Sequence, residues 1–455
     1  MFLLRIFFTI GVCYLFTNGF FLKHFTIPKI DKKAQITYTP EKYELEEQNI
    51  LTNINGFFGV IGPDIRHENI TSLFDLFMCN GNIQGIFLQN GNITFIKHYI
   101  QTEKLLFENK YGEIPNNMLI QTLCFFLHKL KLAPDLLNVA NTAFMKIDNQ
   151  LFALFERDTP YLLDLNFQKK TIETIKKINI LGLQHFSAHS KVVTRQKSKQ
   201  IETIDYDVFK NNVVYYLLNE KFKTLQKIVI PMKHLPIIHD FIITEHKIIL
   251  ADVPLSLSFD FNKIITLLLN KKKNTDIYVI DKNSSHVETF NTNESFYIFH
   301  YANFIEDNEN MFIFASCYDT LDFTEFNLSG KYRKFILHKQ SKKVTIEKND
   351  ELEKYCLDFP MYYDNKVVFS ITDGFLICKD LNIIHKIEFK ESYVCGEPII
   401  HFIDEKPFLL TFTFDKIHKT KSSFLIIDMI TYKIIEVPLN KSLNVGFHSI
   451  FIGQT

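Results

Sequence analysis

The sequence has no tryptophan, no net charge and no cysteine pair at metal-binding spacing. Its 51 basic and 51 acidic residues cancel, so the chain lacks the positive surplus that attracts nucleic acids, and we expect no nucleic-acid partner. Seven cysteines, an odd number, occur without a CxxC motif. Neither a disulfide framework nor a thiolate zinc site is therefore predicted, and reduced thiols are typical of a cytoplasmic protein.

What the chain has is length and apolar content. Its 455 residues, 46% hydrophobic and 22% charged, exclude a disordered or collagen-like polymer and allow a large buried core. Phenylalanine is abundant, with 46 residues beside 19 tyrosines. Two explanations stay open: an AT-rich genome, whose codons favour Phe, Ile, Lys and Asn, or an apolar cavity lined by aromatic rings.

A hydrophobic segment lies within residues 1–30. Ile6 to Leu22 is a run of 17 residues without a charge, which is barely long enough to span a bilayer. The apolar run continues to Lys23 without small residues at a cleavage site, which favours an uncleaved anchor over a signal peptide. Positive charge is heavier after the segment than before it. This predicts a membrane-associated protein with its main domain on the cytoplasmic side, the secretory pathway being the alternative.

Short alternating segments separated by turn residues dominate the chain from about residue 80 onward. Asn90-Gly91 separates two alternating runs, the pattern of a type I′ hairpin turn, in which both central residues need positive φ. Asp373-Gly374 repeats the pattern. One stretch, residues 116–137, has the apolar stripe of a helix. The chain is therefore predicted to be all-β.

Regularly spaced hairpins favour a β-propeller over a sandwich, since radial repetition buries many four-stranded sheets without one oversized open sheet. About seven blades fit at roughly 55 to 60 residues each. The sequence has no WD or kelch repeat, and its periodicity alone leaves the blade count open. We expect a single propeller domain over residues 45–455.

Four of the 16 histidines lie beside hydrophobic, strand-like runs: His189, His239, His300 and His448. The sequence has no local chelate motif such as HExxH, so a metal site would have to be assembled from distant elements. A propeller allows this, because the innermost strands of its blades line one axis. For any one of the four, an ordinary core or surface histidine is the alternative, which spacing does not exclude.

The segments around these histidines form an ordered series from Gly62 to Ile452. In chain order they are Gly62-Pro63, FDLFMCNGNIQGIFLQNGNITFIKHYIQTEK (74–104), ANTAFMKIDNQLFALFERDTPYLLDL (140–165), SAHSKVV, PIIHDFIITEHKIILADVPL, YIFHYANFIED, CLDFPMYY, YVCGEPIIHF and VGFHSIFI. The series resembles, motif by motif and in order, the carotenoid cleavage oxygenase family. These iron(II) enzymes include carotenoid, apocarotenoid and stilbene dioxygenases and retinoid isomerohydrolases.

The resemblance implies a seven-bladed propeller with a helix-and-loop dome over one face and one Fe(II) per chain on the axis. The four histidines would be the iron ligands and the catalytic centre. Three carboxylates are implied to orient histidines: Glu156, Asp358 and Glu397. A carboxylate that accepts the second ring N–H fixes the tautomer and raises the basicity of the ligand. For each carboxylate, a solvated surface residue is the alternative.

Two departures from the family pattern concern this site. Asp358 stands where the family has Glu, one methylene longer, so we expect a backbone shift or a water between it and its histidine. Ser190 replaces the usual Pro after the first ligand, which we expect to loosen that turn. These changes leave the metal site in place, but they weaken any inference about the identity of the substrate.

The implied activity is that of a non-haem Fe(II) dioxygenase, which cleaves a C=C bond of a carotenoid, apocarotenoid or similar conjugated substrate with O2 to give carbonyl products. The implied partners are an apolar substrate, O2 and the membrane from which the substrate is extracted. A retinoid-type isomerohydrolase on the same iron, or a catalytically silent, membrane-anchored propeller that binds a partner, are the alternatives.

Aromatic residues close to the ligand motifs are candidates for the lining of a substrate tunnel: Phe144, Phe241, Phe299 and Phe447. Ordinary propeller core is the alternative for each of them. The helix expected at residues 116–137 would hold the tunnel mouth against the bilayer, or it would pack as part of the dome.

Overall fold

The computed structural model describes residues 33–36, 45–65, 72–114, 118–195, 197–258, 266–325, 328–417, 421–439 and 441–454. The hydrophobic segment predicted within residues 1–30 lies outside the described residues. Among the helices that are described, none combines the length and the apolar character needed to cross a membrane.

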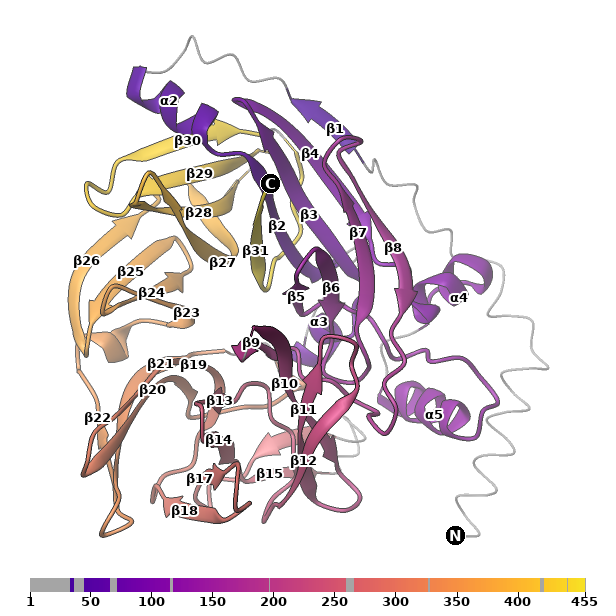
Figure 1. Ribbon diagram of the computed structural model, residues 1–455, viewed down its shortest axis with the longest axis vertical. Helices are drawn as coiled ribbons and strands as arrows, with labels where there is room; N and C mark the ends of the chain where they lie inside the picture. The colour runs from indigo at the N-terminus through magenta and orange to yellow at the C-terminus, as the bar shows by residue number, and fades with distance from the viewer. Residues whose placement is uncertain are drawn as a thin grey trace.

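Across these described ranges, antiparallel strands form seven blades around a central axis, which Figure 1 views nearly end-on. The first blade consists of β1 (Lys33–Ile36), β2 (Gly56–Pro63), β3 (Gly81–Gln89), β4 (Asn92–Tyr99) and β31 (Ser449–Gly453). The second consists of β5 (Ala143–Ile147), β6 (Gln150–Leu154), β7 (Tyr161–Asn166) and β8 (Thr171–Lys177). The third consists of β9 (Lys191–Arg195), β10 (Ser198–Asp207), β11 (Asn212–Asn219) and β12 (Thr224–Pro231). The all-β, seven-bladed prediction is confirmed.

The remaining blades follow in chain order. The fourth consists of β13 (Ile242–Ile243), β14 (Lys247–Asp252), β17 (Asp276–Asp281) and β18 (Val287–Asn291), with an inserted hairpin of β15 (Leu255–Ser258) and β16 (Thr266–Leu269). The fifth consists of β19 (Tyr297–Glu306), β20 (Asn310–Tyr318), β21 (Lys331–His338) and β22 (Val344–Glu347). The sixth consists of β23 (Asp358–Tyr363), β24 (Lys366–Ile371), β25 (Gly374–Lys379) and β26 (Asn382–Glu388). The seventh consists of β27 (Ser392–Ile403), β28 (Lys406–Asp415), β29 (Ser422–Asp428) and β30 (Ile434–Pro438).

The ring of blades is closed by strand pairing between the two ends of the described chain. Strand β31 pairs antiparallel with β2 and forms the inner edge of the first blade. The first blade therefore combines strands from near both ends of the chain. This pairing fastens the C-terminal strand to the N-terminal ones and closes the ring. This closure places the residue before β31, His448, at the axis.

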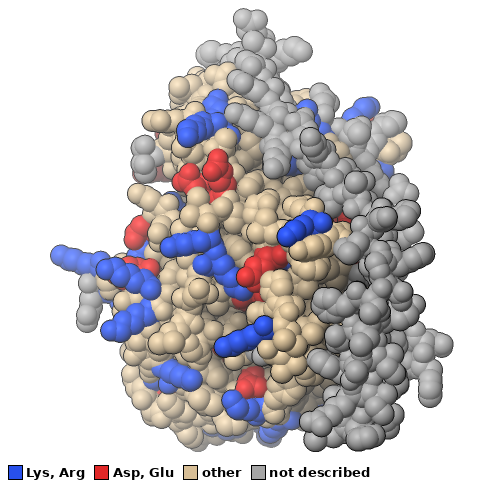
Figure 2. Space-filling view, turned by 90° about the vertical axis from the view of Figure 1, so that its right-hand side faces the viewer, with Lys and Arg blue, Asp and Glu red and all other residues tan. Residues whose placement is uncertain are grey.

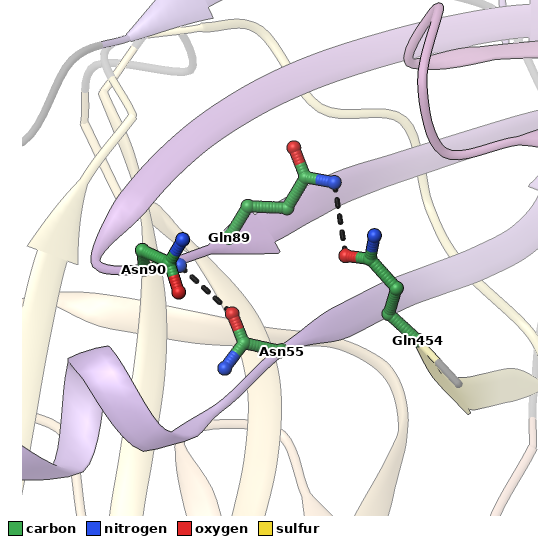
Figure 3. Close-up of a pocket in the computed structure, with 4 residues that line it drawn as sticks. All are labelled: Asn55, Gln89, Asn90 and Gln454. Carbon is green, nitrogen blue, oxygen red and sulfur yellow. Dashed lines mark hydrogen bonds between the residues drawn. The ribbon is translucent and has the colours of Figure 1, made fainter.

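A pocket of about 440 Å³ lies beside this closure, and four carboxamide residues line it (Figure 3). The Gln89 side-chain amide donates to Oε1 of Gln454 at 2.9 Å, and the backbone N–H of Asn90 donates to Oδ1 of Asn55 at 2.8 Å. These bonds connect the tip of the β3–β4 hairpin to both β2 and the end of β31.

The predicted hairpin turns are present, one of them shifted by a residue. Asn90 and Gly91 have φ of 49° and 77°, as a type I′ turn requires. Around Asp373, strand β24 ends at Ile371 and Gly374 already begins β25, so the turn lies one residue earlier than expected. Gly374 is needed for a close approach, since a Cβ there would lie 1.9 Å from the carbonyl oxygen of Ile387.

The predicted helix is confirmed but shorter than expected. Helix α5 (Met118–Lys129) ends well before residue 137. Lys131 adopts a left-handed φ of 58°, and the N–H of Leu132 donates back to the carbonyl oxygen of Leu127, which terminates the helix.

Other helices had no signal in the sequence pattern: α2 (Leu45–Asn53), α3 (Leu73–Phe77), α4 (Glu103–Tyr111) and the 3₁₀ turn Leu352–Lys354. Helix α4 buries Lys104 and Glu108 as well as Leu105, so it has no apolar stripe for the pattern to detect. Its N-terminus is capped by Thr102, whose side chain accepts from the N–H of Leu105. Helices α3, α4 and α5 pack with loop residues in one apolar cluster.

Apolar side chains fill the spaces between adjacent blades. Phe58 of β2 packs against Phe412 of β28 with ring centroids 4.9 Å apart, which joins the first and seventh blades. Tyr332 of β21 packs against Phe369 of β24 at 4.5 Å, which joins the fifth and sixth. Each strand presents alternate residues to its two faces, so every blade contributes to two such clusters.

Candidate metal centre

Four histidines from four blades meet at the propeller axis. One ring nitrogen from each of His189, His239, His300 and His448 lies within 4.8 Å of all the others. Their Nε2 atoms are 3.0 Å apart between His189 and His239, 3.2 Å between His239 and His300, and 3.3 Å between His300 and His448. The residues named from the sequence are therefore brought together, although consecutive members of the set are 50, 61 and 148 positions apart along the chain.

Local backbone features aim these side chains. His300 is in β19, whose pairing with β20 shifts register beside it, and such bulges turn a strand side chain out of the regular alternation. His448 is held by β2, because its carbonyl oxygen accepts from the N–H of Ile61 at 2.9 Å. The preceding Gly446 passes so close to Val60 that a Cβ would lie 2.2 Å from its Cγ1.

The turn at His189 is held by hydroxyl groups. Oγ of Ser187 accepts from the N–H of His189 at 3.1 Å. Oγ of Ser190 lies 2.7 Å from the carbonyl oxygen of Ser187 and 2.8 Å from Oγ1 of Thr203. The expectation that Ser190 loosens this turn was wrong, because its hydroxyl supplies contacts that restrain the turn in place of a proline ring.

Each of the three predicted carboxylates lies against a different histidine. Nδ1 of His300 is 2.6 Å from Oδ1 of Asp358, and Nδ1 of His448 is 3.0 Å from Oε2 of Glu397. Nδ1 of His239 contacts Oε1 of Glu156. Because an ionised carboxylate only accepts hydrogen bonds, these contacts assign the proton of each ring to Nδ1.

This proton assignment makes the centre a site for a cation. With Nδ1 protonated, each Nε2 presents a lone pair, and these lone pairs converge at distances where two acceptors repel each other. A metal ion among them would convert that repulsion into four bonds. Imidazole nitrogen is a preferred donor for iron and its neighbours in the first transition row, so the residues present fit Fe(II).

The electrostatics favour a neutral ring for two of the four histidines. Burial, together with the charge of the other histidines, lowers the pKa of His189 well below its ordinary value. Burial also lowers the pKa of His448, although Glu397 opposes the shift. For His300, burial acts to lower the pKa, but the charge and hydrogen bond of Asp358, together with the charges of Asp240 and Glu397, raise it. Asp358 thus makes His300 a more basic donor.

The family model described as retinal pigment epithelial membrane protein matches residues 38–453, almost the whole chain. The chain belongs to this family. The resemblance to carotenoid cleavage oxygenases is confirmed. Members of the family depend on Fe(II), and the four-histidine group of this member fits that ion.

Curated relatives are plant carotenoid 9,10(9′,10′)-cleavage dioxygenases. The enzyme of Phaseolus vulgaris is 24% identical over 300 residues, which cover 61% of this chain and 54% of the relative. That of Pisum sativum is 25% identical over 297 residues, covering 60% and 53%. The chain therefore spans about half the length of the curated relatives it matches.

Solved structures of the same fold include a variant of the Synechocystis apocarotenoid oxygenase. It superposes with a TM-score of 0.73 at 18% identity and covers 95% of this chain and 98% of its own. The cobalt-substituted form of that oxygenase gives a TM-score of 0.70 at 17% identity, covering 93% and 95%. At these identities the likeness shows the fold.

In this family member, the shorter carboxylate reaches its histidine directly. The pairing of β23 with β24 shifts register between Asp358 and Met361, and the intervening Phe359 adopts a φ of 49°. The side chain of Asp358 therefore reaches His300 without a water between them. The other carboxylate oxygen of Asp358 accepts from the hydroxyl of Tyr318.

A fourth carboxylate at the site, Asp240, was not singled out from the sequence. Its Oδ1 accepts from Nζ of Lys191 at 2.8 Å and lies 3.9 Å from Nδ1 of His189. Its Oδ2 accepts from the N–H of Tyr301 at 3.1 Å. Asp240 thus joins three ligand segments, since it follows one histidine and contacts the segments of two others. The sequence did contain a signal for Asp240: it directly follows His239, and Lys191, its ion-pair partner, lies two residues after His189.

Two of the four proposed tunnel residues lie near the histidines. The ring of Phe299 is 5.2 Å from that of His239. Phe447 precedes His448 and packs against Phe77 at 5.8 Å, and Phe77 also packs against Phe299 at 6.4 Å. Sequence reasoning missed Phe77, which is remote in the chain from the four ligands.

Phe359, also missed, contacts both His300 and His448, at 5.2 and 5.4 Å between ring centroids. The other two proposed tunnel residues pack between blades instead. Phe144 joins the cluster shared by the first and second blades, and Phe241, fully buried, joins that of the third and fourth. Nearness in sequence to a ligand motif did not reveal which face of the strand or loop each ring occupies.

Proposed function

We propose that this chain is a non-haem Fe(II) dioxygenase that cleaves a C=C bond of a carotenoid, an apocarotenoid or a similar conjugated apolar substrate. The observation that carries the proposal is the convergence of four Nε2 atoms, at least three of them on rings whose other nitrogen faces a carboxylate. The names of the plant relatives and of the Synechocystis neighbour support the reaction and the substrate class.

The four histidines would hold Fe(II). This reduced metal would supply the chemistry by which O2 reacts with an electron-rich double bond to give two carbonyl products. The carboxylates Glu156, Asp358 and Glu397 keep the ring protons of His239, His300 and His448 on Nδ1, so the Nε2 atoms of these three rings stay available. The reaction needs no general acid or base from the protein, whose task is to position the substrate and exclude water.

Aromatic side chains close to the histidines provide the apolar surroundings that such a substrate needs. Phe299 and Phe359 lie directly against imidazole rings, and Phe77 extends the aromatic surface to Phe447 and Phe323. A flat polyene would stack on or against these rings, gaining both apolar burial and ring contacts. We infer that this surface lines the approach of the substrate to the metal.

The decisive experiment purifies the full chain without oxygen in the presence of Fe(II) and measures bound iron and turnover. We expect about one iron per chain, as four convergent donors form one site, together with O2 uptake and aldehyde release from β-carotene, apocarotenals or resveratrol. Absence of stoichiometric iron would contradict the proposal. Isomerised retinol from retinyl ester without O2 uptake would point to the isomerohydrolase reaction, and iron without any turnover to a binding protein.

We also propose that the chain contacts a membrane through residues 1–30, through α4 and α5 and through the turn that follows α5. Exposed apolar side chains occur there, with Leu106 at 54%, Leu130 at 57% and Leu132 at 67% exposure, and Phe209 stacks nearby on Phe125. On the face shown in Figure 2, basic and acidic side chains are scattered between wide uncharged areas. Apolar side chains around a tunnel mouth would let a lipid-dissolved substrate enter without crossing water.

Vesicle flotation tests this contact. A chain lacking residues 1–30 should still bind zwitterionic vesicles weakly, and the further change of Leu130 and Leu132 to Ser should abolish binding while iron content is retained. Binding that persists in the combined variant would contradict the role of α5. Cytoplasmic rather than secretory placement of the propeller is a proposal too, tested by protease protection of microsomes after translation.

A further inference from the structure

The carboxylate that faces His300 differs from the two other carboxylates at the centre. Asp358 is one methylene shorter than Glu156 and Glu397, yet its Oδ1 lies 2.6 Å from Nδ1 of His300. The terminal torsion of a carboxylate side chain is broad, so the side chain does not by itself hold one oxygen toward the imidazole. Something else has to fix the plane of this carboxylate.

The hydroxyl of Tyr318 is placed to do so. Tyr318 ends β20, is 2% exposed, and donates its O–H to Oδ2 of Asp358. The two carboxylate oxygens of Asp358 therefore have different side-chain partners, the imidazole of His300 and the phenol, and the backbone N–H of Phe359 also bonds to this carboxylate. A buried carboxylate oxygen without a donor would be costly, so the bond from the phenol both satisfies the oxygen and fixes the rotation of the group.

The surrounding backbone leaves room for this hydroxyl. A Cβ on Gly330 would lie 3.0 Å from the oxygen of Tyr318 and 2.4 Å from the carbonyl oxygen of Leu357, the residue before Asp358. The N–H of Leu357 donates to the carbonyl oxygen of Gly330 at 2.8 Å. Gly330 thus packs against both the phenol and the start of β23, and a larger residue would displace one of them.

The ring of Tyr318 is fixed as well as its hydroxyl. It makes an edge contact with Phe299 at 4.9 Å, and Phe299 in turn contacts the imidazole of His239 at 5.2 Å. Because this packing restrains the ring of Tyr318, its O–H has little freedom to turn away from Asp358. The hydroxyl is therefore preorganised for this one acceptor.

We propose that Tyr318 is a positioning residue of the metal centre: through Asp358 it fixes the orientation and the Nδ1 proton of His300, and it compensates for an aspartate where a longer glutamate would reach unaided. The inference rests on the proposed iron site but concerns a residue outside it. The hydroxyl of Tyr318 bonds to Asp358 and not to a histidine, so its effect on His300 passes through that carboxylate.

The test is Tyr318→Phe, which deletes the hydroxyl and keeps the ring. The matched control is Tyr332→Phe in the adjacent strand β21: Tyr332 is 1% exposed, and its hydroxyl has no hydrogen-bond partner in the described part of the chain. Fe(II) affinity is measured by competition with a chelator, and the geometry of the site by the visible absorption of the Co(II)-loaded protein.

We expect Tyr318→Phe to weaken Fe(II) binding by about 10-fold or more, the size of effect typical of partners that orient metal ligands. The Co(II) spectrum should change, and kcat should fall while KM stays near the wild-type value. Tyr332→Phe should match the wild type in all of these. Unchanged Fe(II) affinity and an unchanged Co(II) spectrum in Tyr318→Phe would overturn the proposal.

A double-variant cycle separates this role from a general effect on folding. In an Asp358→Ala background, which removes both acceptor oxygens, Tyr318→Phe should have no further effect on Fe(II) affinity, because its action passes through the carboxylate. Additive losses would overturn the proposal even if Tyr318→Phe alone is poorly folded. A wild-type chain that binds no iron refutes the proposed function. If the wild type binds iron and Tyr318→Phe binds it with the same affinity, only this inference is refuted.

Discussion

The propeller axis and the flank beside α4 both bury carboxylates, but they balance the charge differently. At the axis, carboxylates face imidazole N–H groups whose other nitrogens converge on one point. The flank cluster consists of Asp135, Asp158, Lys177 and Asn138. There Nζ of Lys177 lies 3.3 Å from Oδ2 of Asp135 and also contacts Asp158, to which Asn138 donates.

The flank cluster therefore has its own cation, Lys177, whereas Glu156, Asp358 and Glu397 at the axis face imidazole rings, and a bound Fe(II) would supply the balancing charge there. The flank links the loop after α5, the turn after β6 and the end of β8, and the N–H of Asp135 also donates to Glu103 at the start of α4. The ion pairs and hydrogen bonds of the flank cluster therefore hold these elements together. Changes at the axis should consequently alter metal binding, and changes at the flank should alter stability.

The largest effect is expected for His189→Ala, which removes one of the four converging nitrogens. This histidine is the cleanest choice, because Asp240 is 3.9 Å from its Nδ1 and keeps Lys191 as partner, so no buried carboxylate is stranded. Fe(II) binding should weaken beyond the ~10–100-fold typical of outer partners, as measured by metal analysis. The control is His246→Ala, at a histidine 64% exposed. If His189→Ala still binds a full equivalent of iron, the claim that the axis binds the metal and the flank only stabilises the fold would be contradicted.

Glu397→Gln should have the next largest effect. Glutamine keeps the size of the side chain and an acceptor oxygen for Nδ1 of His448, but it removes the negative charge that raises the basicity of the ring. Fe(II) affinity should fall by about 10–100-fold in chelator competition. The melting temperature of the iron-free protein should hardly change. The reverse pattern, lower stability with unchanged affinity, would make Glu397 a structural residue like those of the flank.

Lys177→Met should act on stability instead. It leaves Asp135 and Asp158 buried without their shared cation, and breaking a buried ion pair in this way costs about 3–5 kcal/mol. Urea unfolding should show that loss, while the folded protein binds as much Fe(II) as the wild type. Lys176→Met, at the exposed neighbouring position of β8, is the control. Loss of iron from folded Lys177→Met would show that the two regions are coupled.

The smallest effect is a change in pH dependence. Burial, reinforced by the hydrogen bond and charge of Asp135 and opposed by Lys177, raises the pKa of Asp158 to about 7. Since the folded protein holds this proton more tightly than the unfolded chain, stability from this group is present in acid and declines as pH rises from about 4 to 7. Asp158→Asn should flatten that part of the melting profile. A profile parallel to the wild type would contradict this.

Local patterns predicted the repeating part of the fold. Asn90-Gly91 forms its turn because positive φ at both positions suits few other residue pairs. Helix α4 escaped notice because tertiary contacts, not an apolar stripe, hold it: Nζ of Lys104 donates to the carbonyl oxygen of Met78, and Oε1 of Glu108 accepts from the N–H of Ile114. Such buried polar contacts have no sequence period.

The candidate site was predictable where a motif named it. The four histidines and three carboxylates came from ordered resemblance, and the structure brings them together. Tyr318 and Asp240 escaped notice because an isolated tyrosine or aspartate is indistinguishable from many others until its partner is known. Phe144 and Phe241 were near ligand motifs but pack between blades.

The sequence by itself determined the strand repeat, the hairpin turns and which histidines were candidates, since these depend on neighbours in the chain. Only the tertiary structure decided which nitrogen faces the axis and which carboxylate meets which ring. Asp358 meets His300 across 58 positions, and Glu397 meets His448 across 51. Alternation along a strand defines two faces, but it does not show which face points toward the propeller axis. That is decided only when the blades close into a ring.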